Sequence, residues 1–230
     1  MSVAERLSTA KQRIAEACGR VGRRPEDVRI VAVTKTASEP QIIEAVNAGQ
    51  LDLGESRAQV LESHAMAIMG MAGVRWHMIG HLQRNKVRDV LLLVHTIQSV
   101  DSLRLAQEIE KEADRAQKKI PILLQVNAGE EQQKFGVPMA QLVGLAEQMA
   151  SMPHLELQGL MSMAPLTEDI HRVRETFART REAFEEVRAR GLAGDAFREL
   201  SMGMSGDYEI AIEQGATIIR LGSALFGTNA

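Results

Sequence analysis

The sequence has little of what several specialised classes of protein require. It contains one cysteine, Cys18, so no disulfide can form within the chain, as is typical of a reducing compartment. Aromatic residues make up only 3% of the chain and no long run of Lys or Arg occurs, so the stacking rings and clustered cations of a nucleic-acid surface are missing. No stretch approaches the roughly 20 apolar residues that a membrane span needs. These absences predict a cytoplasmic protein that binds neither nucleic acid nor membrane.

The residues that are present have the balance of an ordinary globular protein. Of the 230 residues, 45% are hydrophobic and 25% are charged, and the net charge is −3. A chain of this length can bury most of its apolar surface without disulfides or metals. No Pro/Gly/Ser-rich linker, repeat or low-complexity tract divides it, so we expect residues 1–230 to form a single domain.

Short apolar segments alternate with longer segments of helical period. Between Val3 and Val21, apolar residues recur at spacings of three and four, which predicts an amphipathic helix and not a signal peptide. Strands are then expected at residues 30–34, 51–53, 74–79, 95–98, 122–127 and 156–160, at 199–200 with what precedes them, and at 218–221. Helices are expected between them at residues 41–48, 57–69, 85–92, 102–117, 139–149, 173–190 and 207–214.

This alternation predicts right-handed βαβ units and a parallel sheet. Eight such units after a leading helix predict a closed (β/α)₈ (TIM) barrel with an extra N-terminal helix, a fold whose usual length is about 250 residues. An open doubly wound sheet is the alternative. Its usual marker is a G-x-G-x-x-G turn after the first strand, whereas here that strand ends in residues 33–36 with the sequence Val-Thr-Lys-Thr. We therefore favour the barrel.

Lys35 is the first candidate functional residue. Side chains at the carboxyl ends of barrel strands face the active site, and Lys35 directly follows the apolar run of residues 30–34. We expect its side chain to enter the barrel mouth or core. Burial favours the neutral form of an amine, and a neutral amine attacks a carbonyl carbon to form a Schiff base. A lysine that extends to solvent from the strand end is the alternative.

Two loops rich in small residues predict a phosphate site. Residues 201–206 (Ser-Met-Gly-Met-Ser-Gly) are expected to follow the seventh strand, and residues 220–223 (Arg-Leu-Gly-Ser) to end the eighth, each opening a helix. The loops after strands seven and eight commonly bind phosphate in barrels, because small residues let backbone N–H groups and a helix N-terminus face a dianion. With Lys35 across the barrel mouth, these loops indicate a phosphorylated aldehyde that is held at both ends.

Arg220 is placed to reach a ring nitrogen of such a ligand if the phosphate lies on the amides of Gly222 and Ser223. A guanidinium only donates hydrogen bonds, so it would keep a pyridine nitrogen unprotonated. An unprotonated ring is a poor electron sink, which disfavours most carbanion chemistry. A structural ion pair with Glu55 or Asp207 is the alternative role for this arginine.

Six segments resemble those of the pyridoxal phosphate homeostasis proteins, a family that includes the YggS-like and PROSC-like proteins. In chain order they are residues 33–36 (VTKT), 54–56 (GES), 76–86 (WHMIGHLQRNK), 159–161 (GLM), 200–207 (LSMGMSGD) and 220–227 (RLGSALFG). The resemblance runs from the first helix to the end of the chain, and the W-H-x-I-G-x-L-Q-x-N-K run is very specific.

The resemblance implies a barrel similar to the N-terminal domain of alanine racemase, with pyridoxal 5′-phosphate (PLP) as a Schiff base on Lys35 and Arg220 on the ring nitrogen. The cofactor-binding residues that we carry over or predict are Lys35, Ser56, His77, Ser201, Met204, Ser205, Arg220, Gly222 and Ser223. Family members bind PLP and are linked to vitamin B6 homeostasis without an established reaction. We therefore expect a non-enzymatic PLP carrier, a monomer or weak homodimer, with PLP-dependent apo-enzymes as candidate partners.

Three features depart from the family pattern. Ser56 stands where the family usually has asparagine, which removes an amide contact near the cofactor although a hydroxyl can still donate. Ala37 stands where a second lysine often follows the first strand. The basic tail of some relatives is missing after Ala230. These departures affect the expected transfer of PLP more than its binding.

Two enzymatic alternatives stay open. A PLP racemase needs bases on both faces of the ring, and the only tyrosine here is Tyr208, in the helix after the seventh strand. A Schiff-base aldolase could use Lys35 but would not need Arg220 at a ring nitrogen. His77 and His81 lie four residues apart on a strand and its loop, without another Cys/His pair at ligand spacing, so we expect no metal site.

Overall fold

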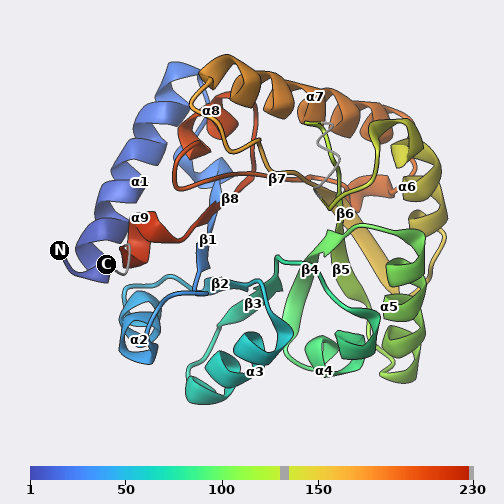
Figure 1. Cartoon of the computed structure of the whole chain (residues 1–230), viewed down its shortest axis with the longest axis horizontal. Helices are drawn as coiled ribbons and strands as arrows, with labels where there is room; N and C mark the ends of the chain where they lie inside the picture. Colours follow the sequence, from blue (N-terminus) through green and yellow to red (C-terminus); the bar gives the residue numbers. More distant parts are fainter. Residues whose placement is uncertain (130–134, 228–230) are drawn as a thin grey trace.

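Eight parallel strands close into a barrel in chain order, and a helix follows each strand around the outside (Figure 1). The computed structural model describes residues 1–129 and 135–227. Each strand pairs with the next, and the last strand closes on the first by setting Val31 opposite Arg220. The predicted (β/α)₈ barrel is confirmed.

The elements agree with the predicted order. The strands are β1 (Arg29–Val33), β2 (Asp52–Glu55), β3 (Arg75–Met78), β4 (Val94–Val100), β5 (Ile120–Gln125), β6 (Leu155–Met161), β7 (Glu199–Met204) and β8 (Ile218–Leu221). The helices are α1 (Val3–Arg20), α2 (Glu39–Asn47), α3 (Ala58–Ala67), α4 (Val87–Leu91), α5 (Leu103–Arg115), α6 (Leu142–Ala150), α7 (Ile170–Ala189), α8 (Tyr208–Glu213) and α9 (Ser223–Phe226). Short 3₁₀ turns precede β1, α4, α6 and β7.

The seventh strand is where the prediction was wrong. We expected it to end at residue 200 and residues 201–206 to form a loop, but β7 continues to Met204. Ser201 pairs with Met161 of β6 and with Ile218 of β8, which holds this segment in the sheet. Gly203, with φ +88°, lies where the register with β8 shifts. Such a bulge breaks the strand pattern in the sequence, so the strand looked shorter than it is.

The N-terminal helix closes the side of the barrel where the first and last strands meet. Ser2 and Glu5 form a reciprocal capping box that starts α1. Its apolar face, which includes Leu7 and Ile14, is buried, and α1 packs against α2, α8 and α9 (Figure 1). Cys18 is buried in the same face. The extra helix predicted from periodicity is therefore present and forms part of the core.

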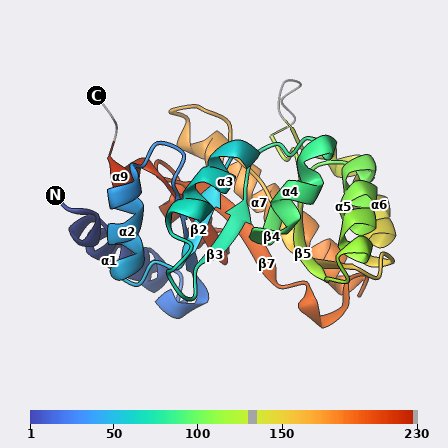
Figure 2. The same cartoon turned by 90° about the horizontal axis from the view of Figure 1, so that it is seen from below.

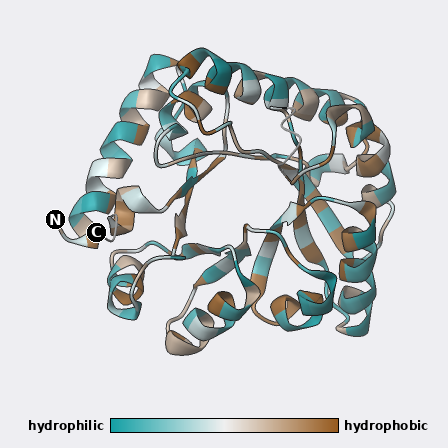
Figure 3. Cartoon of the chain, viewed as in Figure 1, coloured by the Kyte–Doolittle hydropathy of each residue, from teal (hydrophilic) through white to brown (hydrophobic). Residues whose placement is uncertain are grey.

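Apolar residues fill the layer between strands and helices, and a small second cluster lies among the strands. Figure 3 shows polar and apolar residues alternating along the helices, as expected when one face meets the barrel and the other meets solvent. The second cluster consists of Val31, Leu123, Met161 and Ile218. In the part of the chain that the structure describes, no helix is both long and apolar enough to cross a membrane.

The two rims of the barrel carry different connections. Figure 2 shows α9 and the β6–α7 connection on the upper rim, which holds the carboxyl ends of the strands, and the α7–β7 connection on the lower rim. The predicted functional side chains therefore fall mostly on one rim, as the barrel fold requires.

Candidate functional site

A cavity of about 710 Å³ opens at the carboxyl ends of the strands. Its walls come from the segments after β1, β2, β3, β6, β7 and β8 together with Phe135. The predicted cofactor-binding residues that line it are Lys35, Ser56, Met204, Ser205, Arg220, Gly222 and Ser223. His77 and Ser201 do not line it. The structure thus brings most of the predicted set to one place from distant parts of the sequence.

Lys35 lies in a tight turn immediately after β1. The Thr34 hydroxyl donates to Glu55 Oε1 at 2.5 Å, which holds the end of β1 against β2. The Ala37 N–H donates to the Thr34 carbonyl at 2.9 Å, so Lys35 is at the tip of the turn. Its side chain lines the cavity but is exposed. Lys35 thus reaches the barrel mouth, as one of the two predicted positions, but it is not buried, because β1 ends at Val33 and Thr34 is the last buried residue.

The connection from this turn to α2 is fixed by local capping. Ser38 and Gln41 form a capping box at the start of α2. The Gln41 side chain also donates to the carbonyl of Phe226 in α9 at 3.1 Å. The Lys35 turn is therefore anchored next to α9, whose N-terminus lines the same cavity.

Ser205 joins the segment after β7 to the N-terminus of α9. Its hydroxyl oxygen accepts the N–H groups of Gly222 at 3.1 Å and Ala224 at 3.2 Å. The amide of Ser223 lies between them in the chain and donates to no acceptor among the described residues. Backbone N–H groups gathered in this way favour an anion.

Two glycines leave room beside these amides. Gly222 has φ −108°, which any residue adopts, and a Cβ there would lie 3.5 Å from the nearest atom, in Val33. A Cβ on Gly206 would meet no atom within 4 Å. Neither the backbone nor the packing requires glycine at these positions, and both line the cavity. The missing side chains therefore keep the backbone open to a ligand, which fits a phosphate group.

Gly80, within the 76–86 run, has a different role. A Cβ on Gly80 would lie 2.3 Å from the Ser56 carbonyl oxygen, so only glycine allows the ends of β2 and β3 to approach. The Ser99 hydroxyl donates to the Gly80 carbonyl at 2.6 Å and links this segment to β4. This part of the family motif shapes the cavity wall.

Arg220 is the buried cation of the site, with 3% of its surface exposed. Its Nη1 donates to Ser201 Oγ at 2.6 Å and its Nη2 donates to the Ser162 carbonyl at 2.8 Å. Burial lowers the pKa of Arg220 to about 10, and the Asp207 carboxylate opposes this shift. Arg220 therefore stays charged at neutral pH. Glu55, one of the alternative partners considered, instead contacts Thr34 and His64.

His77 and Ser201 lie in the barrel interior, beneath the cavity. His77 is 1% exposed and its Nε2 lies 2.9 Å from Asp52 Oδ1. The Ser201 hydroxyl donates to Gln98 Oε1 at 2.7 Å. Neither Gln98 nor Asp52 was singled out from the sequence, although a polar residue inside an otherwise apolar strand is a signal that could have identified Gln98.

Other candidate groups lie away from the cavity or have structural partners. Tyr208 is buried in α8, with the Arg13 guanidinium 5.9 Å from its ring centre, and it does not line the cavity. His81 lies 3.1 Å from Asp101 and stacks on Phe135. Among residues 1–129 and 135–227, no group of three or more His, Cys, Asp or Glu side chains could hold a metal ion.

Comparison with known proteins first defines the class of barrel. The family model for the alanine racemase N-terminal domain matches residues 7–230. The alanine racemase of Corynebacterium glutamicum has the same fold, with a TM-score of 0.71 and 14% identity over 99% of this chain and 61% of that chain.

Closer relatives define the family. The pyridoxal phosphate homeostasis protein of Aquifex aeolicus is 38% identical over 99% of this chain and 98% of its own, and that of Escherichia coli K12 is 34% identical over 98% and 96%. The structure of PipY from Synechococcus elongatus PCC7942 with PLP bound has a TM-score of 0.87 and 31% identity, covering 98% of this chain and 100% of that one. The chain belongs to the pyridoxal phosphate homeostasis protein family, as the resemblance predicted.

Proposed function

We propose that this chain, as one domain of residues 1–230, binds PLP as a Schiff base on Lys35 and takes part in intracellular PLP homeostasis without turning over a substrate. The observation that carries the proposal is that an exposed amine, Lys35, lines the same cavity as Gly222 and Ser223. The residues present suit both ends of a phosphorylated aldehyde. The family, and the relative with PLP bound, support the same ligand.

Each predicted residue would then contribute through its own chemistry. The Lys35 amine would supply the nitrogen that attaches the aldehyde as a Schiff base, and its two hydrogens would leave with the aldehyde oxygen as water. The Ser223 amide and the Ser205 hydroxyl would receive the phosphate, and Gly222, whose N–H donates to Ser205, would leave room for it. Arg220 donates toward the ring nitrogen. The open cavity and exposed Lys35 leave the linkage accessible from solvent.

The position of Arg220 and that of Tyr208 both favour binding over catalysis. Bound PLP supplies an electron sink, which works best when its ring nitrogen is protonated. Arg220 is buried and charged and cannot accept a hydrogen bond, so it would hold that nitrogen unprotonated. Tyr208, the only tyrosine in the sequence, is buried at the start of α8 with Arg13 of α1 5.9 Å from its ring centre, and it does not line the cavity. These two features support a carrier and not a racemase.

Chemical trapping tests the attachment site. Protein incubated with PLP should be yellow, and borohydride should fix one PLP mass increment on the peptide that contains Lys35. The nearest control is Lys86, a partly exposed lysine on the β3–α4 connection, whose peptide should stay unmodified. Labelling of Lys86 in place of Lys35 would contradict the proposal.

We further propose PLP-dependent apo-enzymes as acceptors, a cytoplasmic location, and a monomer or weak dimer. The exposed Lys35 supports the first point, because an acceptor or a free amine can reach the linkage without opening the core. Loaded protein should activate a PLP-free enzyme, and sedimentation at several concentrations should measure the oligomeric state. Activation no faster than the release of free PLP would argue against direct transfer.

A further inference from the structure

A continuous series of hydrogen bonds crosses the barrel interior from the cavity toward the opposite rim. Arg220 Nη1 donates to Ser201 Oγ at 2.6 Å, and the Ser201 hydroxyl donates to Gln98 Oε1 at 2.7 Å. Gln98 Nε2 lies 3.1 Å from His77 Nδ1. His77 Nε2 lies 2.9 Å from Asp52 Oδ1. All five side chains are buried, and they come from five different strands or strand ends.

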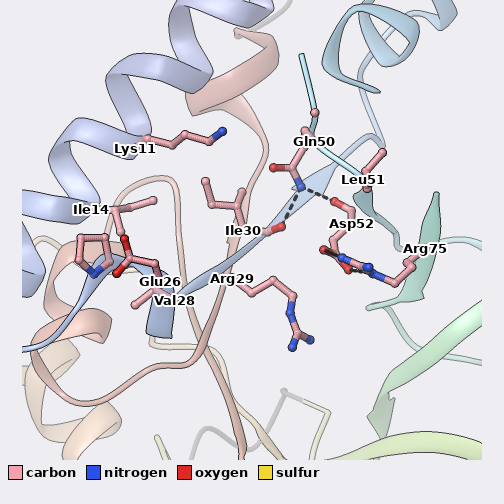
Figure 4. A pocket seen from close by; sticks show the side chains of 12 residues that line it. Lys11, Ile14, Glu26, Val28, Arg29, Ile30, Gln50, Leu51, Asp52 and Arg75 are labelled. Carbon is pink, nitrogen blue, oxygen red and sulfur yellow. Dashed lines mark hydrogen bonds and ion pairs between the residues drawn. The ribbon is translucent and has the colours of Figure 1, made fainter. Parts of the chain in front are cut away.

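The far end of this series is an ion pair at the amino-terminal rim. Arg75 Nε donates to Asp52 Oδ1 at 2.8 Å and Arg75 Nη2 donates to Oδ2 at 2.5 Å (Figure 4). Burial alone would raise the pKa of Asp52, but hydrogen bonds from Arg75 and His77 outweigh burial and hold that pKa well below its usual range. Asp52 is therefore a carboxylate at all ordinary pH values. It lines a second cavity, of about 500 Å³, on this rim.

The donors and acceptors available on these side chains fix which partner donates in each hydrogen bond of the series. An ionised Asp52 only accepts, so His77 Nε2 carries the proton that faces it. A neutral His77 then has a bare Nδ1, which accepts from the Gln98 amide nitrogen. The amide oxygen of Gln98 consequently faces Ser201 and accepts the hydrogen bond that the Ser201 hydroxyl donates. Ser201 is left with lone pairs for Arg220, so every bond points from the cation at one end to the anion at the other.

The opposite direction is disfavoured by the same inventory. With the amide of Gln98 reversed, its nitrogen would donate to Ser201 Oγ, and the Ser201 proton would lose the acceptor that it has in Gln98 Oε1. His77 would then have to donate from Nδ1, and it would either become a buried cation or turn a bare Nε2 toward the Asp52 carboxylate. A buried polar network with an unmatched member is costly, so the orientation at Ser201 follows from the charge on Asp52.

We propose that Asp52, His77, Gln98 and Ser201 are positioning residues for Arg220: the carboxylate on one rim sets the hydrogen-bond direction at the guanidinium that faces the ligand on the other rim. This inference rests on the proposed function only in assigning the cofactor ring to Arg220. It also accounts for the presence of His77 and Ser201 in the motifs that carry the resemblance, although neither residue lines the cavity. Their effect on PLP is transmitted through Arg220.

Other charged groups around His77 do not supply the same control. Arg75 lies on the same strand and is held by Asp52. His95, on β4, has its ring centre 6.0 Å from that of His77 in an edge-to-face arrangement. Desolvation, then the neighbouring His77 and Arg75, lower the pKa of His95. His95 is therefore uncharged at neutral pH and above. Asp52 is the anion that contacts His77.

Nitrogen NMR tests the direction of the series in the protein without PLP. The imidazole of His77, assigned by its loss in His77→Asn, should show a protonated Nε2 and a bare Nδ1 in the wild type. In Asp52→Asn the single tautomer should give way to a mixture or to the Nδ1–H form. A wild-type His77 that carries its proton on Nδ1 would overturn the proposal, and this result does not depend on whether PLP binds.

Spectroscopy with PLP tests transmission to Arg220. Asp52→Asn should weaken PLP binding by about threefold to tenfold and shift the pH midpoint of the near-violet absorbance, because Arg220 loses its fixed acceptor. The matched control is Glu110→Gln, which alters another carboxylate–histidine pair, with His154 at 2.9 Å, on the outside of the barrel. The control should leave both quantities unchanged. Equal behaviour of Asp52→Asn and wild type would overturn the proposal.

A double-mutant cycle separates positioning from general destabilisation. Ser201→Ala removes one oxygen atom from the middle of the series and leaves the Asp52–Arg75 pair untouched. If Asp52 acts through Ser201, Asp52→Asn should have little further effect on PLP affinity or on the pH midpoint in the Ser201→Ala protein. Fully additive effects would show that Asp52 acts by another route. Failure of the wild type to bind PLP would instead reject the proposed function and leave the NMR result standing.

Discussion

The two ends of the barrel both have cavities but differ in how their polar groups are used. At the amino-terminal rim, Arg75 binds Asp52 through two nitrogens, and Arg29 pairs with Glu199 at 3.0 Å. The Gln50 side chain donates to two backbone carbonyls there (Figure 4). At the carboxyl rim, Lys35 forms no ion pair with any residue in the ranges 1–129 and 135–227.

The comparison shows that cavity volume alone does not identify a binding site. Three charged side chains that border the amino-terminal cavity of about 500 Å³, those of Arg29, Asp52 and Arg75, already have ionic partners. The carboxyl cavity of about 710 Å³ is lined by the Lys35 amine, the Ser205 hydroxyl and the Ser223 backbone, so it has donors left for a ligand. This division matches the general use of the two faces of a barrel.

The largest effect on PLP binding is expected when a lysine at each rim is replaced, in separate variants, by alanine. Lys35→Ala should abolish the near-violet band and the borohydride-fixed mass, while the free energy of unfolding changes by less than about 0.5 kcal/mol because the side chain is exposed. Lys11→Ala, at the border of the amino-terminal cavity, should leave the band unchanged. Absorbance and denaturant titration measure both. Retention of the band in Lys35→Ala would remove the basis of the comparison.

A smaller effect is expected from filling the backbone opening at Gly222. Gly222→Leu should fold normally, since a Cβ there makes only ordinary contacts. It should weaken PLP by at least tenfold and pyridoxal far less, because each charge-assisted hydrogen bond to phosphate contributes roughly 1.5–3 kcal/mol. Gly144→Leu, on the exposed face of α6, is the control and should change neither affinity. Equal losses for the two ligands would show that this loop does not hold phosphate.

Breaking the ion pair of the opposite rim should affect stability. Asp52→Ala should lower the free energy of unfolding by about 2–3 kcal/mol at pH 7, from lost hydrogen bonds to a charged group. The folded-state pKa of Asp52 is depressed, so this contribution is complete above the unfolded value of about 3.9 and is lost as pH falls toward the folded value. Denaturant titrations of the two proteins from pH 7 downward should therefore converge. A difference that persisted unchanged at low pH would contradict the assignment to the ionised pair.

The smallest effect is expected for catalysis, because the protein should not accelerate exchange of the α-proton of an amino acid. If Arg220 faces the ring nitrogen as proposed, and with Tyr208 outside the cavity, exchange of the α-proton of L- or D-alanine for solvent deuterium should stay near the rate for free PLP. Proton NMR measures the exchange, and Lys35→Ala with PLP serves as the background. Rapid exchange by the wild type would favour the racemase alternative.

The sequence was informative where the signal is local. Strand and helix periods predicted the barrel, and the small residues at 205–206 and 222–223 indicated two loops that line the cavity. It was misleading for β7, where Gly203 disrupts the pattern, and it left open the position of Lys35, whose burial depends on where β1 ends. It did not identify Asp52 or Gln98, because a single polar residue in a short strand does not reveal its partner.

By itself the sequence determined the order and type of the elements, since hydrophobic period and capping act over a few residues. It also determined the chemistry available at the strand ends, because a barrel brings those ends together whatever the loops contain. Only the tertiary structure decided which polar groups have partners. Ser201 and Gln98 are 103 positions apart in the chain, and their hydrogen bond exists because β4 and β7 face each other across a closed barrel. Closure of the barrel therefore leaves Lys35 accessible to a ligand, while it brings Arg75 and His77 into hydrogen-bond contact with Asp52.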